Sequence, residues 1–195
     1  MKYIFGTLVL ALLTTIHVSA QMPAQTVPAF TFKKLNKAIF SNNDLQPGKQ
    51  LFFVFFDTEC EHCQRAIQYL GQHYQEFNRT AIYLITLDSM AKLTGFMNKY
   101  GRNLKDKKNV TILQDSWNEF IGKFGPRKYP SLFLYSEKKE LMLYEDNEQN
   151  LFRFKGLIGC KKKAFKFNDL KALNFAGGAE ATTFEPFCKR SIENQ

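Results

Sequence analysis

Two cysteines with two residues between them, Cys60 and Cys63, carry the clearest chemical signal in this chain. Only the thiolate form of cysteine is a nucleophile, and a helix N-terminus stabilises a thiolate through its unpaired backbone N–H groups and the helix dipole. At a spacing of three residues, helical geometry brings both thiols to one side of a turn, close enough to form a disulfide. Such a pair at the start of a helix indicates thiol–disulfide redox chemistry.

The same cysteines could instead bind a metal ion. A closed zinc site normally takes four ligands, often including a second close pair of Cys or His residues. His62 and His73 could serve as further ligands, but Cys160 and Cys188 are single residues far downstream, so there is no second close pair. A copper or zinc chaperone that uses the cysteine pair with His62 is therefore the alternative hypothesis to a redox enzyme.

The flanking segments place the cysteines where a buried strand leads into a helix. Residues 51–56 form an unbroken apolar run of the length expected for a strand buried on both faces. After the connection at residues 57–59, the helical spacing of three apolar residues predicts a helix from Cys63 to about Phe77. These three residues are Ala66, Ile67 and Leu70.

Strand and helix patterns alternate along the rest of the chain. Strands are predicted at 30–32, 38–40, 81–87, 110–113, 131–135 and 141–144, with a further edge strand at 151–154. Helices are predicted at 90–100, 117–124 and 167–173, the first two after the capping pairs Asp88-Ser89 and Asp115-Ser116. This order predicts an α/β fold with parallel central strands, an antiparallel C-terminal hairpin and helices on both faces of the sheet.

The N-terminal residues have the pattern of an export signal. Lys2 precedes an apolar stretch at 4–16 and the small residues Val18-Ser19-Ala20, which predicts a signal peptide of residues 1–20. The stretch is short for a membrane span, so we expect a soluble exported protein, for example in a bacterial periplasm. The mature chain then consists of one domain at 21–175 and a C-terminal tail at 176–195.

Charge and the remaining cysteines extend this prediction. The formal net charge is +9, and removal of Lys2 with the signal leaves +8. No nucleic-acid-binding module is recognisable, so this charge indicates a solvated basic surface or attraction to acidic partners. In an oxidising compartment Cys160 and Cys188 could form a structural disulfide that stabilises the fold by roughly 3 kcal/mol, a second redox pair, or two free thiols.

Residues 55–63, the order of strands and helices, and Tyr129-Pro130-Ser131 together resemble the thioredoxin superfamily, and most closely its exported TlpA-like thiol–disulfide oxidoreductases. The resemblance covers residues 30–173 and implies a thioredoxin-like fold. It also implies that Cys60 attacks and Cys63 resolves the mixed disulfide, without a metal or organic cofactor. The implied partners are protein thiols or disulfides and a redox partner protein.

The resemblance further implies a substrate-binding segment at Tyr129 and Pro130. In this family the peptide bond before the matching proline is cis, and the backbone of the preceding residue pairs with the extended chain of the substrate. A proline that begins a strand is also compatible with a trans bond. A thioredoxin-fold peroxidase is a further alternative, but it would need an activating Arg and a Thr beside a lone attacking cysteine.

Two positions next to the cysteines depart from the family pattern. Glu59 replaces the usual Trp before the first cysteine, and His62 replaces the frequent Pro before the second. His at this position, as in disulfide isomerase and DsbA-type oxidants, favours the thiolate of the first cysteine, whereas Glu59 and Glu61 disfavour it. The direction of electron flow is therefore open.

The proton acceptor for Cys63 also differs from the family. The buried acid of thioredoxins is replaced here by Val54, and the Glu that is frequent in TlpA-like proteins is replaced by Ala66. By proximity alone, the candidate acceptors are Asp57 and the two neighbouring glutamates, Glu59 and Glu61.

Overall fold

The structure is a computed structural model that describes residues 22–158 of the 195. The predicted signal peptide, the helix at 167–173, the Cys160–Cys188 pairing and the tail lie outside the described residues. No helix within residues 22–158 is long and apolar enough to cross a membrane.

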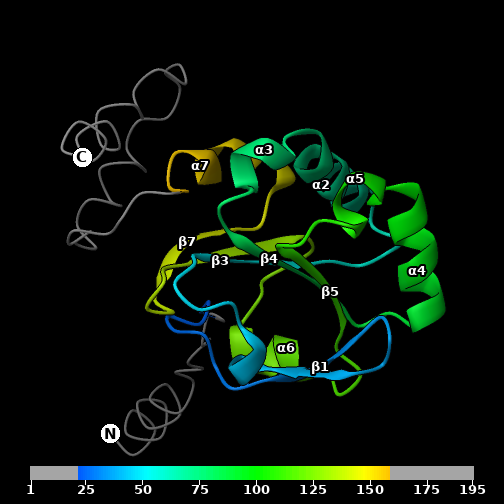
Figure 1. Cartoon of the computed structure of the whole chain (residues 1–195), viewed down its shortest axis with the longest axis horizontal. Coiled ribbons are helices and arrows are strands. Elements are labelled where there is room, and N and C mark those ends of the chain that lie inside the picture. The colour runs from blue at the N-terminus through cyan, green and yellow to red at the C-terminus, as the bar shows by residue number, and fades with distance from the viewer. Residues whose placement is uncertain (1–21, 159–195) are drawn as a thin grey trace, which may run out of the picture.

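One mixed sheet forms the centre of the fold (Figure 1). Its order is β2-β1-β5-β4-β3-β6-β7. The strands are β1 (Thr31–Lys34), β2 (Ile39–Ser41), β3 (Leu51–Phe55), β4 (Ala81–Thr86), β5 (Val110–Gln114), β6 (Ser131–Tyr135) and β7 (Leu141–Glu145). β3, β4 and β5 are parallel, and β6 and β7 add an antiparallel hairpin beside β3. The predicted sheet is confirmed, and the N-terminal β1–β2 hairpin extends its other edge.

Helices cover both faces of this sheet, as the sequence predicts. The short 3-10 helices are η1 (Asn42–Asp44) and η2 (Glu148–Asn150). The α-helices are α2 (Glu61–Gln72), α3 (Tyr74–Phe77), α4 (Met90–Lys99), α5 (Arg102–Lys105), α6 (Glu119–Phe124) and α7 (Leu151–Lys155). Figure 1 shows α2, α3, α5 and α7 on one side of the sheet and α6 on the other.

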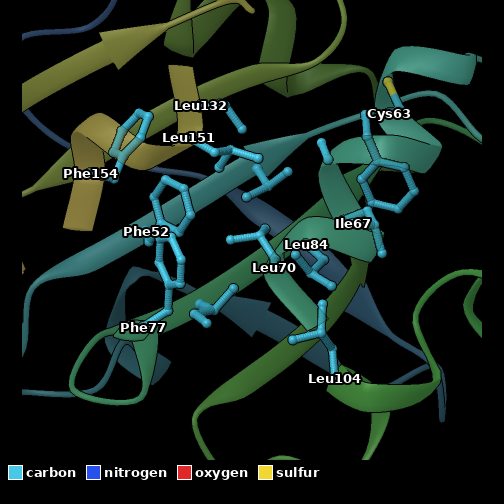
Figure 2. Close-up of a cluster of buried hydrophobic side chains, with 14 of the residues drawn as sticks. Phe52, Cys63, Ile67, Leu70, Phe77, Leu84, Leu104, Leu132, Leu151 and Phe154 are labelled. Carbon is cyan, nitrogen blue, oxygen red and sulfur yellow. The ribbon is translucent and has the colours of Figure 1, made fainter. Parts of the chain in front are cut away.

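The alternating side chains of β3 divide the core into two layers. Phe52 and Val54 pack under α2, whereas Phe53 and Phe55 pack on the α6 side, and all four are buried. Figure 2 shows Phe52 in the first layer with Leu70 and other apolar side chains of the helices. An apolar run without alternation thus marks a strand covered on both faces, which makes β3 a rigid support for the loop that follows it.

The helix after the cysteines starts earlier than predicted and is interrupted before its predicted end at Phe77. α2 begins at Glu61, two residues earlier than predicted, because Cys60 itself is its N-cap. The helix is interrupted at His73, whose backbone angles leave the helical region, and α3 continues only to Phe77.

Two other predicted elements need correction. The helix predicted from Trp117 begins at Glu119, because Asp115 accepts the backbone N–H groups of Trp117 and Phe120 and holds the preceding residues in a turn. The edge strand predicted at 151–154 is wrong, since this segment is α7. Leu151 and Phe154, three residues apart, are both buried on one helical face, whereas a strand would have placed them on opposite faces.

Candidate active site

Cys60 and Cys63 meet at the first turn of α2. The Cys60 Sγ accepts a hydrogen bond from the Cys63 backbone N–H at 3.4 Å, so its sulfur lies at the positive end of the helix. Cys60 is partly exposed, Cys63 is fully buried, and both thiols are free. Figure 2 shows Cys63 on the same helix as the core residues Ile67 and Leu70. The arrangement presents one sulfur to a reactant and keeps the second directly behind it.

A short turn connects β3 to this helix. The Asp57 carbonyl accepts the Cys60 N–H at 3.4 Å, and the Asp57 carboxylate accepts the Glu59 N–H at 2.7 Å. Because Phe56 is buried and its N–H is bonded to the carbonyl of Ile85 in β4, the turn starts from a fixed point. Its own hydrogen bonds then determine where Cys60 stands.

Asp88, at the end of β4, braces the same turn from the side. Its carboxylate accepts the Thr58 N–H at 2.9 Å and the Thr58 hydroxyl at 2.7 Å, and Lys92 lies at 4.0 Å. The sequence assigned Asp88 only to a capping pair, and the capping hydrogen bond is made by Ser89. Partial burial raises the pKa of Asp88, but the hydrogen bonds from Thr58 and Thr86 and the charge of Lys92 outweigh it, so the pKa of this carboxyl lies below its ordinary value.

We expect Asp88→Asn to destabilise the protein at neutral pH by roughly 1–3 kcal/mol, because charged hydrogen bonds to Thr58 would be lost. A carboxyl with a lowered folded-state pKa stabilises the fold above its unfolded pKa, and this stabilisation disappears as the pH falls through the folded-state value. The difference between wild type and variant should therefore shrink below about pH 4. Urea unfolding at several pH values measures it, and a constant difference down to pH values near 2 would contradict this role.

The acidic side chains near the cysteines lie in different directions. Glu59 pairs with Lys92 at 2.6 Å, and Glu61 is exposed with its carboxylate 3.9 Å from Arg65. Burial raises the pKa of the Cys63 thiol, and the hydrogen bond with Cys60 acts in the same direction. A backbone hydrogen bond of Asp57 lowers this pKa, and the negative charge of Asp57 raises it more weakly. Asp57 is the carboxylate whose charge acts on Cys63, which separates it from the other two candidate proton acceptors.

His62 contacts a segment that is distant in the sequence. Its Nδ1 lies 2.8 Å from the Glu148 carboxylate and 2.8 Å from an Arg65 guanidinium nitrogen. Glu148 comes from η2, and only 9% of its side chain is exposed. Burial raises the pKa of Glu148, but the hydrogen bonds from His62 and Arg65 outweigh it and leave that pKa below its ordinary value. The sequence gives no signal for this contact, because 86 residues separate the partners.

The predicted substrate-binding segment lies beside the cysteine turn. The Tyr129–Pro130 peptide bond is cis, as expected, and Pro130 is buried. The Tyr129 ring packs on Phe55 with ring centroids 4.9 Å apart. Burial, followed by the negative charges of Asp57 and Asp88, raises the pKa of Tyr129 to about 12. Tyr129 therefore shares one electrostatic environment with the turn that precedes Cys60.

The hydroxyl groups of Tyr144 and Ser131 hold the residues on either side of Tyr129. The Tyr144 hydroxyl accepts the Arg127 N–H and lies within hydrogen-bonding distance of the Ser131 hydroxyl, both at 2.9 Å. The Ser131 hydroxyl in turn donates to the Lys128 carbonyl at 2.6 Å. These bonds involve side chains of β6 and β7 and hold the segment on both sides of Tyr129 in place.

The alternative metal-binding reading finds little support in the geometry. Within residues 22–158, no three His, Cys, Asp or Glu side chains are grouped so that they could hold a metal ion. His62 is engaged with Glu148, and His73, at the far end of α2, pairs with Glu76 at 2.8 Å. In the described part of the chain, the two histidines that the chaperone hypothesis offers as ligands therefore contact carboxylates instead.

Comparison with known proteins gives consistent matches. The model of the AhpC/TSA family matches residues 23–143. The chain is 23% identical over 134 residues to the thiol-disulfide oxidoreductase ResA of Bacillus thuringiensis (strain Al Hakam), which covers 67% of this chain and 73% of that protein. The family match includes the cysteine turn and the segment at Tyr129.

Two solved structures share the fold. A secreted Mycobacterium tuberculosis disulfide oxidoreductase homologous to E. coli DsbE matches with a TM-score of 0.51 and 22% identity, over 60% of this chain and 83% of that one. A thiol-disulfide oxidoreductase from Bacteroides fragilis NCTC 9343 matches with a TM-score of 0.57 and 15% identity, over 68% of this chain and 99% of that one. The predicted thioredoxin-like fold is therefore confirmed.

Proposed function

The chain belongs to the AhpC/TSA family of the thioredoxin superfamily, and we propose that this thiol–disulfide oxidoreductase acts through Cys60 and Cys63 on exported protein substrates. One observation carries the proposal: a partly exposed thiol caps a helix, and a buried second thiol lies one turn behind it. The hydrogen bond from the Cys63 N–H to the Cys60 sulfur, at 3.4 Å, supports disulfide exchange in two steps, because it holds the first thiol within one helical turn of the second.

In the reducing direction, the Cys60 thiolate attacks one sulfur of a substrate disulfide. The substrate S–S bond breaks, a mixed disulfide forms at Cys60, and the released substrate thiolate takes up a proton. Cys63 then loses its proton and attacks the Cys60 sulfur, which releases the second substrate thiolate and leaves a Cys60–Cys63 disulfide. Two electrons pass from the cysteine pair to the substrate, and oxidation of a substrate dithiol follows the same steps in reverse.

Tyr129 and Pro130 are proposed to hold the substrate during this exchange. The Tyr129 backbone would pair with an extended substrate chain, while Pro130 lies buried beneath it. Substrates are proposed to be protein thiols or disulfides of an exported compartment, and the electrons to come from or go to a redox partner protein. The secreted nature of one structural relative supports this location.

Peroxide reduction by a lone Cys60 is the alternative that the family name brings forward. It requires a Thr and an Arg free to activate a peroxide at the sulfur. Both polar hydrogens of Thr58 go to Asp88, and Arg65 is bound to Glu148 and His62. The neighbouring residues thus favour exchange through the cysteine pair.

The test is a redox titration of the full chain against a dithiothreitol or glutathione series, with thiol alkylation mapped by mass spectrometry. We expect Cys60 and Cys63 to interconvert as one disulfide. A potential near thioredoxin's, about −270 mV, would identify a reductase, and one near DsbA's, about −120 mV, an oxidant or isomerase. Absence of this disulfide, with metal retention or peroxide turnover instead, would overturn the proposal.

A further inference from the structure

Positive charge is distributed unevenly between the two ends of the molecule. At the cysteine end, four cations lie on the elements that carry or flank the site, and each pairs with a carboxylate. These are Arg65, Lys92, Arg127 and Lys128. The charge of this end is thereby largely neutralised within the protein.

The opposite end carries a second group of cations, which we call the basic pole. It consists of Arg79, Lys99, Arg102, Lys105, Lys107 and Lys108, all exposed. Five of the six lie between residues 98 and 109, where Asp106 is the single acidic residue. Within residues 22–158, none of the six forms an ion pair with a carboxylate.

Chain direction places this pole away from the cysteines. Cys60 follows β3, whereas Lys107 and Lys108 precede β5, which runs parallel to it through β4. α2 runs from Cys60 toward α5, where Gly71 approaches Asn103. At about 1.5 Å per residue, α2 alone separates the two ends by roughly 18 Å. Figure 1 shows α5 beside α2 and α4, where the pole lies.

Local contacts hold the pole together as one surface. Asn109, which follows Lys108, donates to the carbonyls on both sides of Arg79, at Asn78 and Thr80. Lys107 lies over the Tyr74 ring at 4.8 Å, and Lys105 donates to Asn98 at 2.8 Å. The cations therefore project from fixed backbone positions, while their charges have no fixed counter-ion in the described protein.

The side chains of the pole help to decide between an acidic protein and an extended layer of anions as its partner. A stable protein interface normally contains apolar or aromatic anchors at its centre. The exposed large apolar side chains of the described residues lie elsewhere, at Met22, Ile39, Trp117, Ile121 and Phe152. A charged surface without such anchors fits purely electrostatic adsorption to an extended layer of anions.

We propose that the basic pole docks the protein on an anionic phospholipid surface. Several Lys and Arg side chains near such a surface act together, and each adds to the attraction until salt screens it. In this orientation the N-terminus of α2, with the cysteines, points away from the membrane, and the cysteine end faces protein substrates. The proposal is independent of the redox reaction, because no residue of the pole contacts the cysteine turn.

The test measures binding of the full chain to vesicles of phosphatidylcholine, with and without phosphatidylglycerol. We expect the wild type to bind the anionic vesicles at least about tenfold more tightly at low salt, and to lose this preference near 0.5 M salt, where the Debye length is only about 4 Å. The difference between the two vesicle types isolates the electrostatic part, because any apolar contribution of the chain is common to both.

The variant R79Q/K105Q/K108Q should lose most of the preference for anionic vesicles. The matched control K33Q/K34Q/K123Q removes the same charge from β1 and α6 and should keep it, and both variants should retain the thiol–disulfide exchange rate. Equal loss in both variants would mean that net charge alone matters and would overturn the proposal. The proposal would also be overturned if the wild type showed no preference for anionic vesicles, or if it bound an acidic polypeptide through the basic pole but bound both kinds of vesicle equally.

Discussion

Replacing Cys60 with serine is expected to lower the rate of disulfide exchange by at least about 10³-fold, because a serine hydroxyl does not attack a disulfide and the buried Cys63 cannot reach a protein substrate. Insulin reduction by the full chain with dithiothreitol as electron donor measures this rate. The fold should be unaffected, since the serine oxygen can still cap α2 by accepting the Cys63 N–H.

Cys63→Ser is expected to have a different effect from Cys60→Ser, so the two variants together distinguish the attacking thiol from the resolving thiol. The first step at Cys60 is intact, but the mixed disulfide has no resolving thiol and should accumulate. Mass spectrometry under non-reducing conditions should find the substrate attached to Cys60. A Cys160→Ser/Cys188→Ser double variant is the matched control and should keep exchanging disulfides at room temperature. If that control loses activity while Cys60→Ser keeps it, the reactive pair has been assigned to the wrong cysteines.

The sequence predicts an element of the fold well where the pattern of buried residues lies entirely within that element. β3 is recognisable because all of its side chains are apolar, and α4 because Ser89 caps a run with Leu93, Phe96 and Met97 on one face. The segment at 151–154 is too short for its pattern to decide between the two classes, because Leu151 and Phe154 fit one helical turn whereas Phe152 and Phe154 fit one face of an edge strand. Its packing against Phe52 settles the choice, and that contact is not local.

In the active site too, the sequence predicts the features that depend on neighbouring residues and misses the contacts between distant segments. The position of Cys60 at a helix N-terminus follows from neighbouring residues, and the sequence predicts it. Asp88 and Glu148 were not recognised as partners of the cysteine turn and of His62, because β4 and η2 meet these groups only after the sheet has formed. A carboxylate close in sequence can also point elsewhere, as Glu59 does toward Lys92.

The effect of Asp57→Asn on the rate at which Cys63 resolves the mixed disulfide should show which role Asp57 has. A charge effect and a proton-acceptor role change this rate in opposite directions. The negative charge of Asp57 raises the pKa of the Cys63 thiol, so removing the charge should lower that pKa and favour the Cys63 thiolate. If charge were its only role, Asp57→Asn would speed the resolution of the mixed disulfide. If Asp57 accepts the Cys63 proton, the same variant should slow resolution, by about 10²-fold, as loss of a general base does.

The pH dependence of resolution separates the two roles. Burial raises the pKa of Cys63, so its thiol stays neutral at pH values well above its ordinary pKa. In Asp57→Asn, hydroxide would have to remove this proton, and the resolution rate should therefore rise about tenfold per pH unit through the neutral range. The wild type, with an internal acceptor, should show a flatter profile. Stopped-flow release of a model mixed disulfide measures both, with the exposed Glu61→Gln as the matched control, which we expect to remain within about twofold of wild type. A faster Asp57→Asn variant would leave Asp57 as a charge that holds Cys63 protonated, and the proton would then have to leave through water at the turn.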